Sequence, residues 1–136
     1  MKAWKIRVLT AALALTGLGA STSAFAQARG YVVNGQGWMR MAPQERVAYV
    51  QGLNDSVNHP YVNDDLETAV VKYARTRCLI ELKIAPNMLS DVITNGYNQR
   101  TEMMRETPLF VYVVRLSDIC KRFIAEERAK MGLPTR

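Results

Sequence analysis

One histidine and its neighbours are the first place in this chain to look for chemistry. His59 is the single histidine, and Asp55 and Ser56 lie within four residues of it. A serine hydrolase needs a serine, a histidine and a carboxylate in a defined geometry, often with the serine on a sharp turn between a strand and a helix. Three side chains crowded into one short segment do not set up that geometry, and the chain has no such nucleophile motif. We therefore expect that this protein is not an enzyme.

The same region gathers oxygen and nitrogen donors of the kind that hold metal ions. Asp55, His59, Asp64 and Asp65 lie within eleven positions of one another. Their spacing does not match a calcium-binding loop. Asp64 and Asp65 are better explained as residues at the start of a helix, where a carboxylate interacts favourably with the helix dipole. The sequence therefore predicts no metal and no cofactor, and it places His59 in a polar loop before Pro60.

The first 26 residues have the three parts of a cleavable signal peptide. Three basic residues lie between positions 2 and 7, an uncharged apolar stretch covers residues 8–20, and a small-x-small site ends at Ala24-Phe25-Ala26. An apolar stretch of about 13 residues is shorter than the roughly 17–25 that a membrane span needs. We expect export to the periplasm, cleavage between Ala26 and Gln27, and no stable insertion in the membrane afterwards.

Cleavage would also change the charge of the protein. The full chain has 18 basic and 12 acidic residues. The leader holds three of the basic residues and none of the acidic ones, so the mature chain would carry 15 minus 12, or +3, over 110 residues. A charge this small does not argue for binding to nucleic acid, and neither does export. A chain of this length is expected to form one domain.

Two cysteines, Cys78 and Cys120, remain in the mature chain. They are too far apart in sequence to form a CxxC redox motif. An even number of cysteines in an oxidising compartment favours a disulfide over free thiols. We therefore expect a single bond between Cys78 and Cys120.

The spacing of apolar residues predicts helices along most of the mature chain. Prolines and capping residues predict starts near residues 42, 64, 87 and 107, and the helices are expected over 42–57, 64–83, 87–103 and from Pro108 to about 130. Residues 27–37 are Gly-rich and predict an extended arm, and residues 131–136 a flexible tail. We therefore predict a compact all-α domain over residues 38–130, with four or more helices and one disulfide that ties the second helix to the fourth.

Two further expectations concern positions within these helices. Asn63 or Asp64 is expected to cap the second helix. Gly52 falls inside the first helix, where a close approach by a neighbouring helix would explain a residue that disfavours helices. The apolar face of the second helix is expected to comprise Leu66, Val70, Tyr73 and Ile80.

Aromatic side chains in predicted loops could anchor a partner or cover a small core. Tyr31, Trp38 and Tyr61 lie in such segments, and both roles are common for loop aromatics. The sequence favours the covering role slightly without excluding the other. The residues considered for binding a partner are Trp38, His59, Tyr61 and Tyr97.

Three segments carry a resemblance to a known family. They are WMRMAPQERVAYVQGLNDS (38–56), RCLIELKIAPNMLSDVITNGY (77–97) and TPLFVYVVRLSDIC (107–120). The series resembles the Tai/Rap family of small periplasmic immunity proteins, which neutralise amidase effectors of type VI secretion. The resemblance implies an all-helical, disulfide-bonded periplasmic fold. It also implies binding to a peptidoglycan amidase, often as a homodimer.

Three functions follow as hypotheses. The first is an exported helical binding protein that resembles immunity proteins and inhibits a cell-wall amidase. The second is a periplasmic chaperone of the acid-stress type, which would loosen when carboxylates that are paired in the native state become protonated. The third is a domain of the same fold with an unrelated binding role. The first and the third hypotheses both involve a protein partner rather than a nucleic acid.

Overall fold

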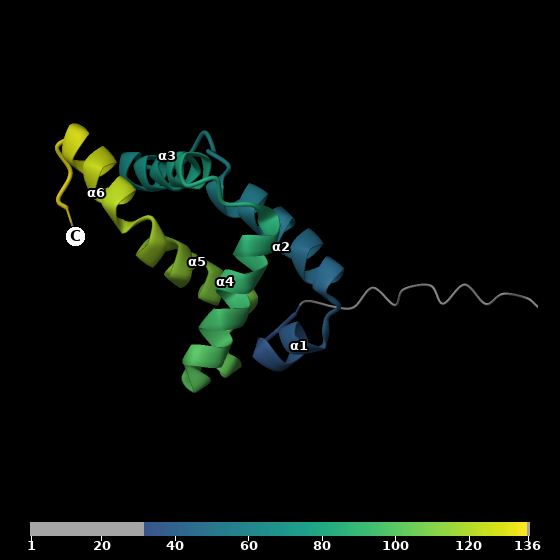
Figure 1. The fold of residues 1–136 in the computed structure, drawn as a ribbon. Coiled ribbons are helices and arrows are strands. Elements are labelled where there is room, and N and C mark those ends of the chain that lie inside the picture. Colours follow the sequence, from purple (N-terminus) through teal and green to yellow (C-terminus); the bar gives the residue numbers. More distant parts are fainter. Residues whose placement is uncertain (1–31, 136) are drawn as a thin grey trace, which may run out of the picture.

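The computed structural model describes residues 32–135, which form an all-α domain with one disulfide, as predicted (Figure 1). None of these residues lies in a strand, and none of their helices is both long and apolar enough to cross a membrane. The expected leader, the expected cleavage site at Ala24 to Gln27, and Tyr31 lie outside the described residues. The helices are α1 (Gly35–Arg40), α2 (Pro43–Asn58), α3 (Leu66–Glu81), α4 (Pro86–Gln99), the 3-10 helix η1 (Thr101–Arg105), α5 (Pro108–Ile119) and α6 (Lys121–Lys130).

The helix starts follow from local chemistry. Proline occupies the first position of α2, α4 and α5, where its missing N–H leaves no hydrogen bond unmade. Thr107 caps α5 by accepting a hydrogen bond from the Phe110 N–H. The cap of α3 is Asp65, which accepts from the Thr68 N–H at 2.7 Å, so the expected cap at Asn63 or Asp64 is wrong.

The N-terminal arm is shorter than the sequence predicts. Residues 35–37, assigned to an extended arm over 27–37, form the first turn of α1. The side chain of Asn34 accepts a hydrogen bond from the Gly37 N–H, and a side-chain cap of this kind stabilises a helix start. Burial of Trp38 in the same helix holds it against the core. These two interactions outweigh the low helix propensity of two glycines.

Two predicted helices are each divided in the structure. The helix expected over 87–103 ends at Gln99, and the chain continues as η1 after Arg100, which is extended. The long helix expected from Pro108 to about 130 changes direction at Cys120, where α5 ends and α6 begins. The change allows α6 to pack along α3 rather than continue the line of α5 (Figure 1).

The packing of α4 against its neighbours forms the centre of the domain. Helix α4 contacts both α2 and α5 (Figure 1). Gly96 lies where α4 meets α5, because a Cβ at this position would come within 2.6 Å of Val111 Cγ1. A glycine at a helix crossing allows two backbones to approach closely. The fully buried side chains at this centre include Trp38, Val50, Ile93, Val111, Tyr112 and Leu116.

The buried face of α3 differs from the predicted one. Val70, Ala74 and Cys78 are buried and recur every four residues, as one face of a helix requires. Of the four residues expected on this face, only Val70 lies there, and Leu66, Tyr73 and Ile80 are more than half exposed. The small Ala74 and the disulfide cysteine occupy the interface with the rest of the domain.

The C-terminal residues are attached to α6 as far as Pro134. Gly132 has a φ of +67°, the left-handed conformation that commonly ends a helix. The Leu133 N–H donates to the Arg128 carbonyl, and Arg128 Nε donates to the Pro134 carbonyl at 2.6 Å. The segment expected as a flexible tail therefore folds back on the end of α6 up to this point.

Gly52 gives a first test of the packing. A Cβ built on this residue meets no described atom within 4 Å, so the expected close approach of another helix is wrong. Glycine in an exposed helix interior costs about 1 kcal/mol relative to alanine. We therefore expect Gly52→Ala to raise the free energy of unfolding by about 1 kcal/mol in urea denaturation. Gly96→Ala is the matched control and should lower it, and a loss of stability in Gly52→Ala would contradict its open surroundings.

Candidate functional site

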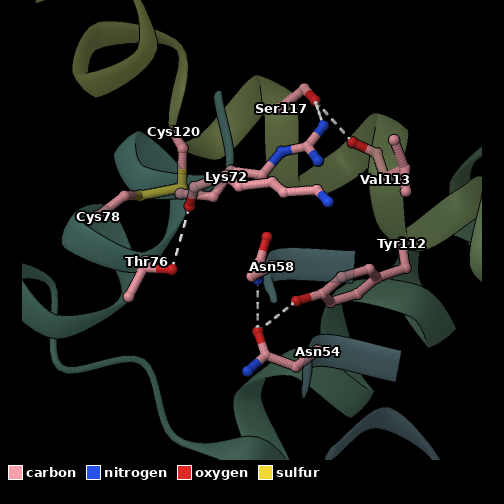
Figure 2. The surroundings of a disulfide bond; sticks show 10 residues. Asn54, Asn58, Lys72, Thr76, Cys78, Tyr112, Val113, Ser117 and Cys120 are labelled. Carbon is pink, nitrogen blue, oxygen red and sulfur yellow. Dashed lines mark hydrogen bonds between the residues drawn. A yellow bond between two sulfur atoms is a disulfide. The ribbon is translucent and has the colours of Figure 1, made fainter. Parts of the chain in front are cut away.

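Both cysteines are joined in a buried disulfide, so neither of them is a reactive thiol on the surface. Cys78 of α3 is bonded to Cys120, where α5 meets α6, and both residues are fully buried (Figure 2). The bond confirms the predicted pairing. It fixes the end of α3 to the point at which the chain turns into α6, and we assign it a structural role.

A buried polar cluster lies near the disulfide and joins α2, α3 and α5 (Figure 2). The side-chain carbonyl of Asn54 accepts hydrogen bonds from the Tyr112 hydroxyl and from Asn58 Nδ2, both at 2.8 Å. Burial raises the pKa of Tyr112 to about 12, so its hydroxyl remains a donor at neutral pH. In the same region Arg75 donates to Ser117. These bonds fix the three helices relative to one another.

His59 and Tyr61, both considered for partner binding, are exposed in the loop between α2 and α3. Their ring centroids lie 5.0 Å apart in an edge arrangement. Lys72 Nζ lies 4.4 Å from the centre of the Tyr61 ring and donates to the His59 carbonyl and to Asp64. The loop is thus fastened to α3 through one lysine, with both rings accessible.

The acidic residues near this loop have structural roles. Hydrogen bonds from Lys72 and from the Tyr61 N–H lower the pKa of Asp64, and the N–H of Thr68 lowers the pKa of Asp65. No hydrogen bond joins the His59 ring to the nearby serine or aspartate among the described residues. Residues 32–135 contain no group of three or more His, Cys, Asp or Glu side chains that could hold a metal.

Trp38 and Tyr97, the other two residues considered for partner binding, belong to the core. Trp38 is 0 % exposed and Tyr97 is 1 % exposed. Trp38 Nε1 donates to Thr94 Oγ1 at 3.0 Å, and the Tyr97 hydroxyl donates to the Glu106 carbonyl at 3.0 Å. Since neither ring can reach a partner in this structure, their assignment to a binding surface is wrong. The covering role holds for Trp38.

Several large apolar side chains are exposed around the turn between α3 and α4. Ile80 is 70 % exposed, and Leu82 and Met88 are each 45 % exposed. Ile119, at the end of α5, is 38 % exposed and lines the same hollow as Leu82 and Met88. We call this the α3–α4 surface, defined by Ile80, Leu82, Ile84, Met88 and Ile119.

Two hollows give the α3–α4 surface its shape, and they meet at Ile84. The first has a volume of about 620 Å³ and lies between the middle of α2 and the end of α3, with Ile80 and Lys83 on its wall. The second lies between the start of α4 and Ile119. An exposed apolar patch with concave parts is typical of a site where another protein binds.

Lys83 lies at the turn of the α3–α4 surface in a conformation that favours glycine. Its φ is +52°. The Lys83 N–H donates to the Ile80 carbonyl, and the Ile84 N–H donates to the Leu79 carbonyl, which is the hydrogen-bond pattern of a Schellman motif. The same pattern at the end of α6 uses Gly132. Lys83 therefore places an amino group at the edge of the apolar surface despite a backbone cost.

The charges along the seam of α3 and α6 are neutralised. Arg77 pairs with Glu81, Glu126 and Glu127. Arg128, although buried, pairs with Glu67 at 2.6 Å. Hydrogen bonds from Lys130 and Arg77 lower the pKa of Glu127. This seam holds α6 in place and offers little net charge to a partner.

The sequence did not indicate the α3–α4 surface. Ile80 was expected on a buried face, and no feature of the sequence singled out Leu82 or Met88. The only local signal is that Ile80 lies two residues after Cys78 on α3, and therefore faces away from the buried row. Comparison of the chain with protein-family models, with curated proteins and with solved structures finds no match.

Proposed function

We propose that this chain is an exported binding protein and that its protein partner docks on the α3–α4 surface. The observation that carries the proposal is the group of large apolar side chains left exposed around one turn. Burying such side chains against a partner would gain free energy in proportion to the apolar area removed from water. Apolar anchors at the centre of an interface usually account for most of its affinity.

The resemblance to the Tai/Rap family suggests which partner this is. We propose that the chain acts as an immunity protein in the periplasm and inhibits a peptidoglycan amidase. The disulfide is compatible with an oxidising compartment. Inhibition by binding needs no catalytic group in the inhibitor, which agrees with a candidate site composed of apolar side chains.

A matched pair of variants tests the docking surface. Leu82 and Leu109 are 45 % and 44 % exposed, but Leu109 lies ten residues before Ile119 on α5, roughly 15 Å along the helix. We expect Leu82→Glu to weaken binding to the partner by about 30-fold, the equivalent of about 2 kcal/mol for an interface anchor. Leu109→Glu should leave the affinity unchanged, because it adds the same charge at the same exposure away from the surface.

The experiment uses the full chain, expressed with its leader and recovered from the periplasm. Proteins captured from an envelope extract are identified by mass spectrometry, and a captured amidase is then purified for binding and inhibition assays. Equal affinity of both variants for the partner would reject the α3–α4 surface. Capture without any cell-wall hydrolase would reject the immunity role and leave the docking surface to be judged on the partner found.

A further inference from the structure

Helix α6 is attached to the domain largely through charged side chains. It packs along α3 and, to a smaller extent, against α5 (Figure 1). Three of its ten residues are buried, and only Phe123 among them is apolar, since the other two are Glu127 and Arg128. The centre of the domain around α4 is held differently, by buried apolar and aromatic side chains such as Ile93 and Leu116. Ionisation of side chains therefore matters more for α6 than for this centre.

Glu127 is the one carboxylate that is buried among residues 32–135, with 5 % of its surface exposed. Its Oε1 accepts hydrogen bonds from Lys130 Nζ at 2.7 Å and from Arg77 of α3. Such partners offset the hydration that an ionised carboxylate loses on burial. Protonation of Glu127 would weaken both bonds and remove one of the counter-ions of Arg77.

Glu127 belongs to a seam whose charges balance at neutral pH. The ion pairs of the seam join four carboxylates to four cations, namely Glu67, Glu81, Glu126 and Glu127 with Arg77, Arg122, Arg128 and Lys130. Helix α5 adds Arg115 and Asp118, which pair with each other, and Asp118 lines a hollow together with Lys121 and Arg128. When the carboxylates are protonated, the cations remain and repel one another across α3 and α6.

The disulfide determines how α6 can move. Cys120, at the start of α6, is bonded to Cys78 of α3, so this end of the helix stays in place whatever the state of the seam. Beyond the other end, the Leu133 N–H and the Pro134 carbonyl bond to Arg128, which belongs to α6 itself. The helix and the residues that follow it can therefore move as one unit about its first residue.

We propose that α6 is released by acid: protonation of the seam carboxylates detaches it from α3, with the disulfide as the pivot. Release would uncover Phe123, which is 2 % exposed. It would also uncover Val70 and Ala74, which are buried between Glu67 and Arg77 on the face of α3 that pairs with α6. The protein would thus gain a second apolar surface at low pH while the core around α4 stays folded. The inference concerns the seam and does not depend on a partner for the α3–α4 surface.

The direction of the pH dependence follows from Glu127. Hydrogen bonds from Lys130 and Arg77 hold its pKa below the ordinary value for glutamate, about 4.3. Ionised Glu127 therefore stabilises the attached helix fully at neutral pH, and this stabilisation is lost as the pH falls below about 4.3 and through the lowered pKa. Asp64 and Asp65 also have lowered pKa values, but they fasten the α2–α3 loop and cap α3.

Amide hydrogen exchange of the full chain, expressed with its leader and recovered from the periplasm, measures the release. Rates at neutral pH and at about pH 3 are compared after correction for the intrinsic pH dependence of exchange. We expect protection in α6 to fall at least about ten-fold more than protection in α4, because α6 opens by itself. Anilinonaphthalene sulfonate, a dye that binds exposed apolar surface, should fluoresce over the same pH range. Both changes should reverse on return to neutral pH.

A pair of variants tests the role of the buried carboxylate. Glu127→Gln keeps the shape of the side chain and removes its charge. At neutral pH we expect α6 of this variant to exchange about ten-fold faster than in the unaltered protein, because a buried ion pair has lost one partner, and the further loss of protection in acid should be smaller. Asp64→Asn is the matched control, since it removes a carboxylate that pairs with a lysine in the α2–α3 loop, and it should leave α6 unchanged.

Three outcomes would overturn the inference. Loss of protection in α4 and α6 together at the same pH would show that acid unfolds the whole domain. Unchanged protection of α6 in Glu127→Gln, or an equal effect of Asp64→Asn, would show that the buried carboxylate does not hold the helix. If Glu127→Gln does not fold, the comparison of α6 with α4 in the unaltered protein decides the question. The Leu82→Glu comparison is made at neutral pH and stays valid in every case.

Discussion

Replacing both Cys78 and Cys120 by alanine should lower the free energy of unfolding by about 4 kcal/mol, the chain-entropy value for a loop of this length. The bond joins residues that are 42 positions apart. Without it, the unfolded chain regains the freedom that the cross-link removes. Domains of this size are usually stable by about 5–15 kcal/mol, so the loss is a large share of the total.

The position of the bond suggests which part of the domain is affected first. Helix α6 packs mainly on α3 and has fewer contacts with α5. The disulfide is the covalent link between α3 and the point at which α6 begins. We therefore expect amide hydrogen exchange to accelerate most in α6 when the bond is removed, since this helix would retain only non-covalent attachment to α3.

Urea denaturation of the oxidised protein and of the double variant measures the effect. Trp38 reports unfolding because it is buried and is the single tryptophan of residues 32–135. The control is to add a reductant to both proteins after unfolding, which should affect the oxidised protein alone. A difference of less than about 1 kcal/mol would show that the loop-closure argument fails for this domain.

The sequence predicted the helix starts better than the paths of the helices. Proline and threonine at 107–108 act within one turn, so the beginning of α5 could be read locally. The change of direction at Cys120 could not, because apolar spacing continues through it to Phe123. It depends on the attraction between α6 and α3, which are far apart in sequence and whose ion pairs involve Arg77.

The exposure of large side chains was predicted least well. Trp38 and Tyr97 lie at positions that apolar spacing did not identify as core, and they are buried because α1 and η1 close over the end of α4. Ile80 and Leu82 look like core residues in sequence, yet no helix of the described chain covers them. Hydrophobicity indicates which side chains gain free energy from burial. The packing of helices that are distant in sequence decides which of these side chains are buried.

The stability that the disulfide provides offsets part of the stability lost by leaving the apolar side chains of the α3–α4 surface exposed. Apolar side chains that stay exposed to water do not add to the stability of the fold, and a small domain has few apolar side chains to bury in total. A cross-link that stabilises the fold by about 4 kcal/mol offsets part of that loss. The same bond anchors the end of α3, so it holds Ile80 and Leu82 in place.

Trp38→Ala should destabilise the domain by about 3–5 kcal/mol, the usual cost of removing a buried aromatic ring. The indole packs against Tyr49 with ring centroids 6.0 Å apart and donates a hydrogen bond to Thr94. It therefore connects α1 to both α2 and α4. Trp38→Phe is the matched control and should cost much less, because it retains most of the ring volume and loses only the hydrogen bond, worth about 1 kcal/mol.

The same two variants decide between a core role and a partner-binding role for Trp38. Circular dichroism during urea denaturation gives the stability, since the tryptophan signal is lost in both proteins. If Trp38 belongs to the core, Trp38→Ala lowers the unfolding midpoint, and the fraction that remains folded binds the partner with unchanged affinity. If the ring instead anchors a partner, the midpoint stays constant and the affinity falls. Complete burial of the indole predicts the first result, because a side chain without exposed surface can reach a partner only after α1 has moved away.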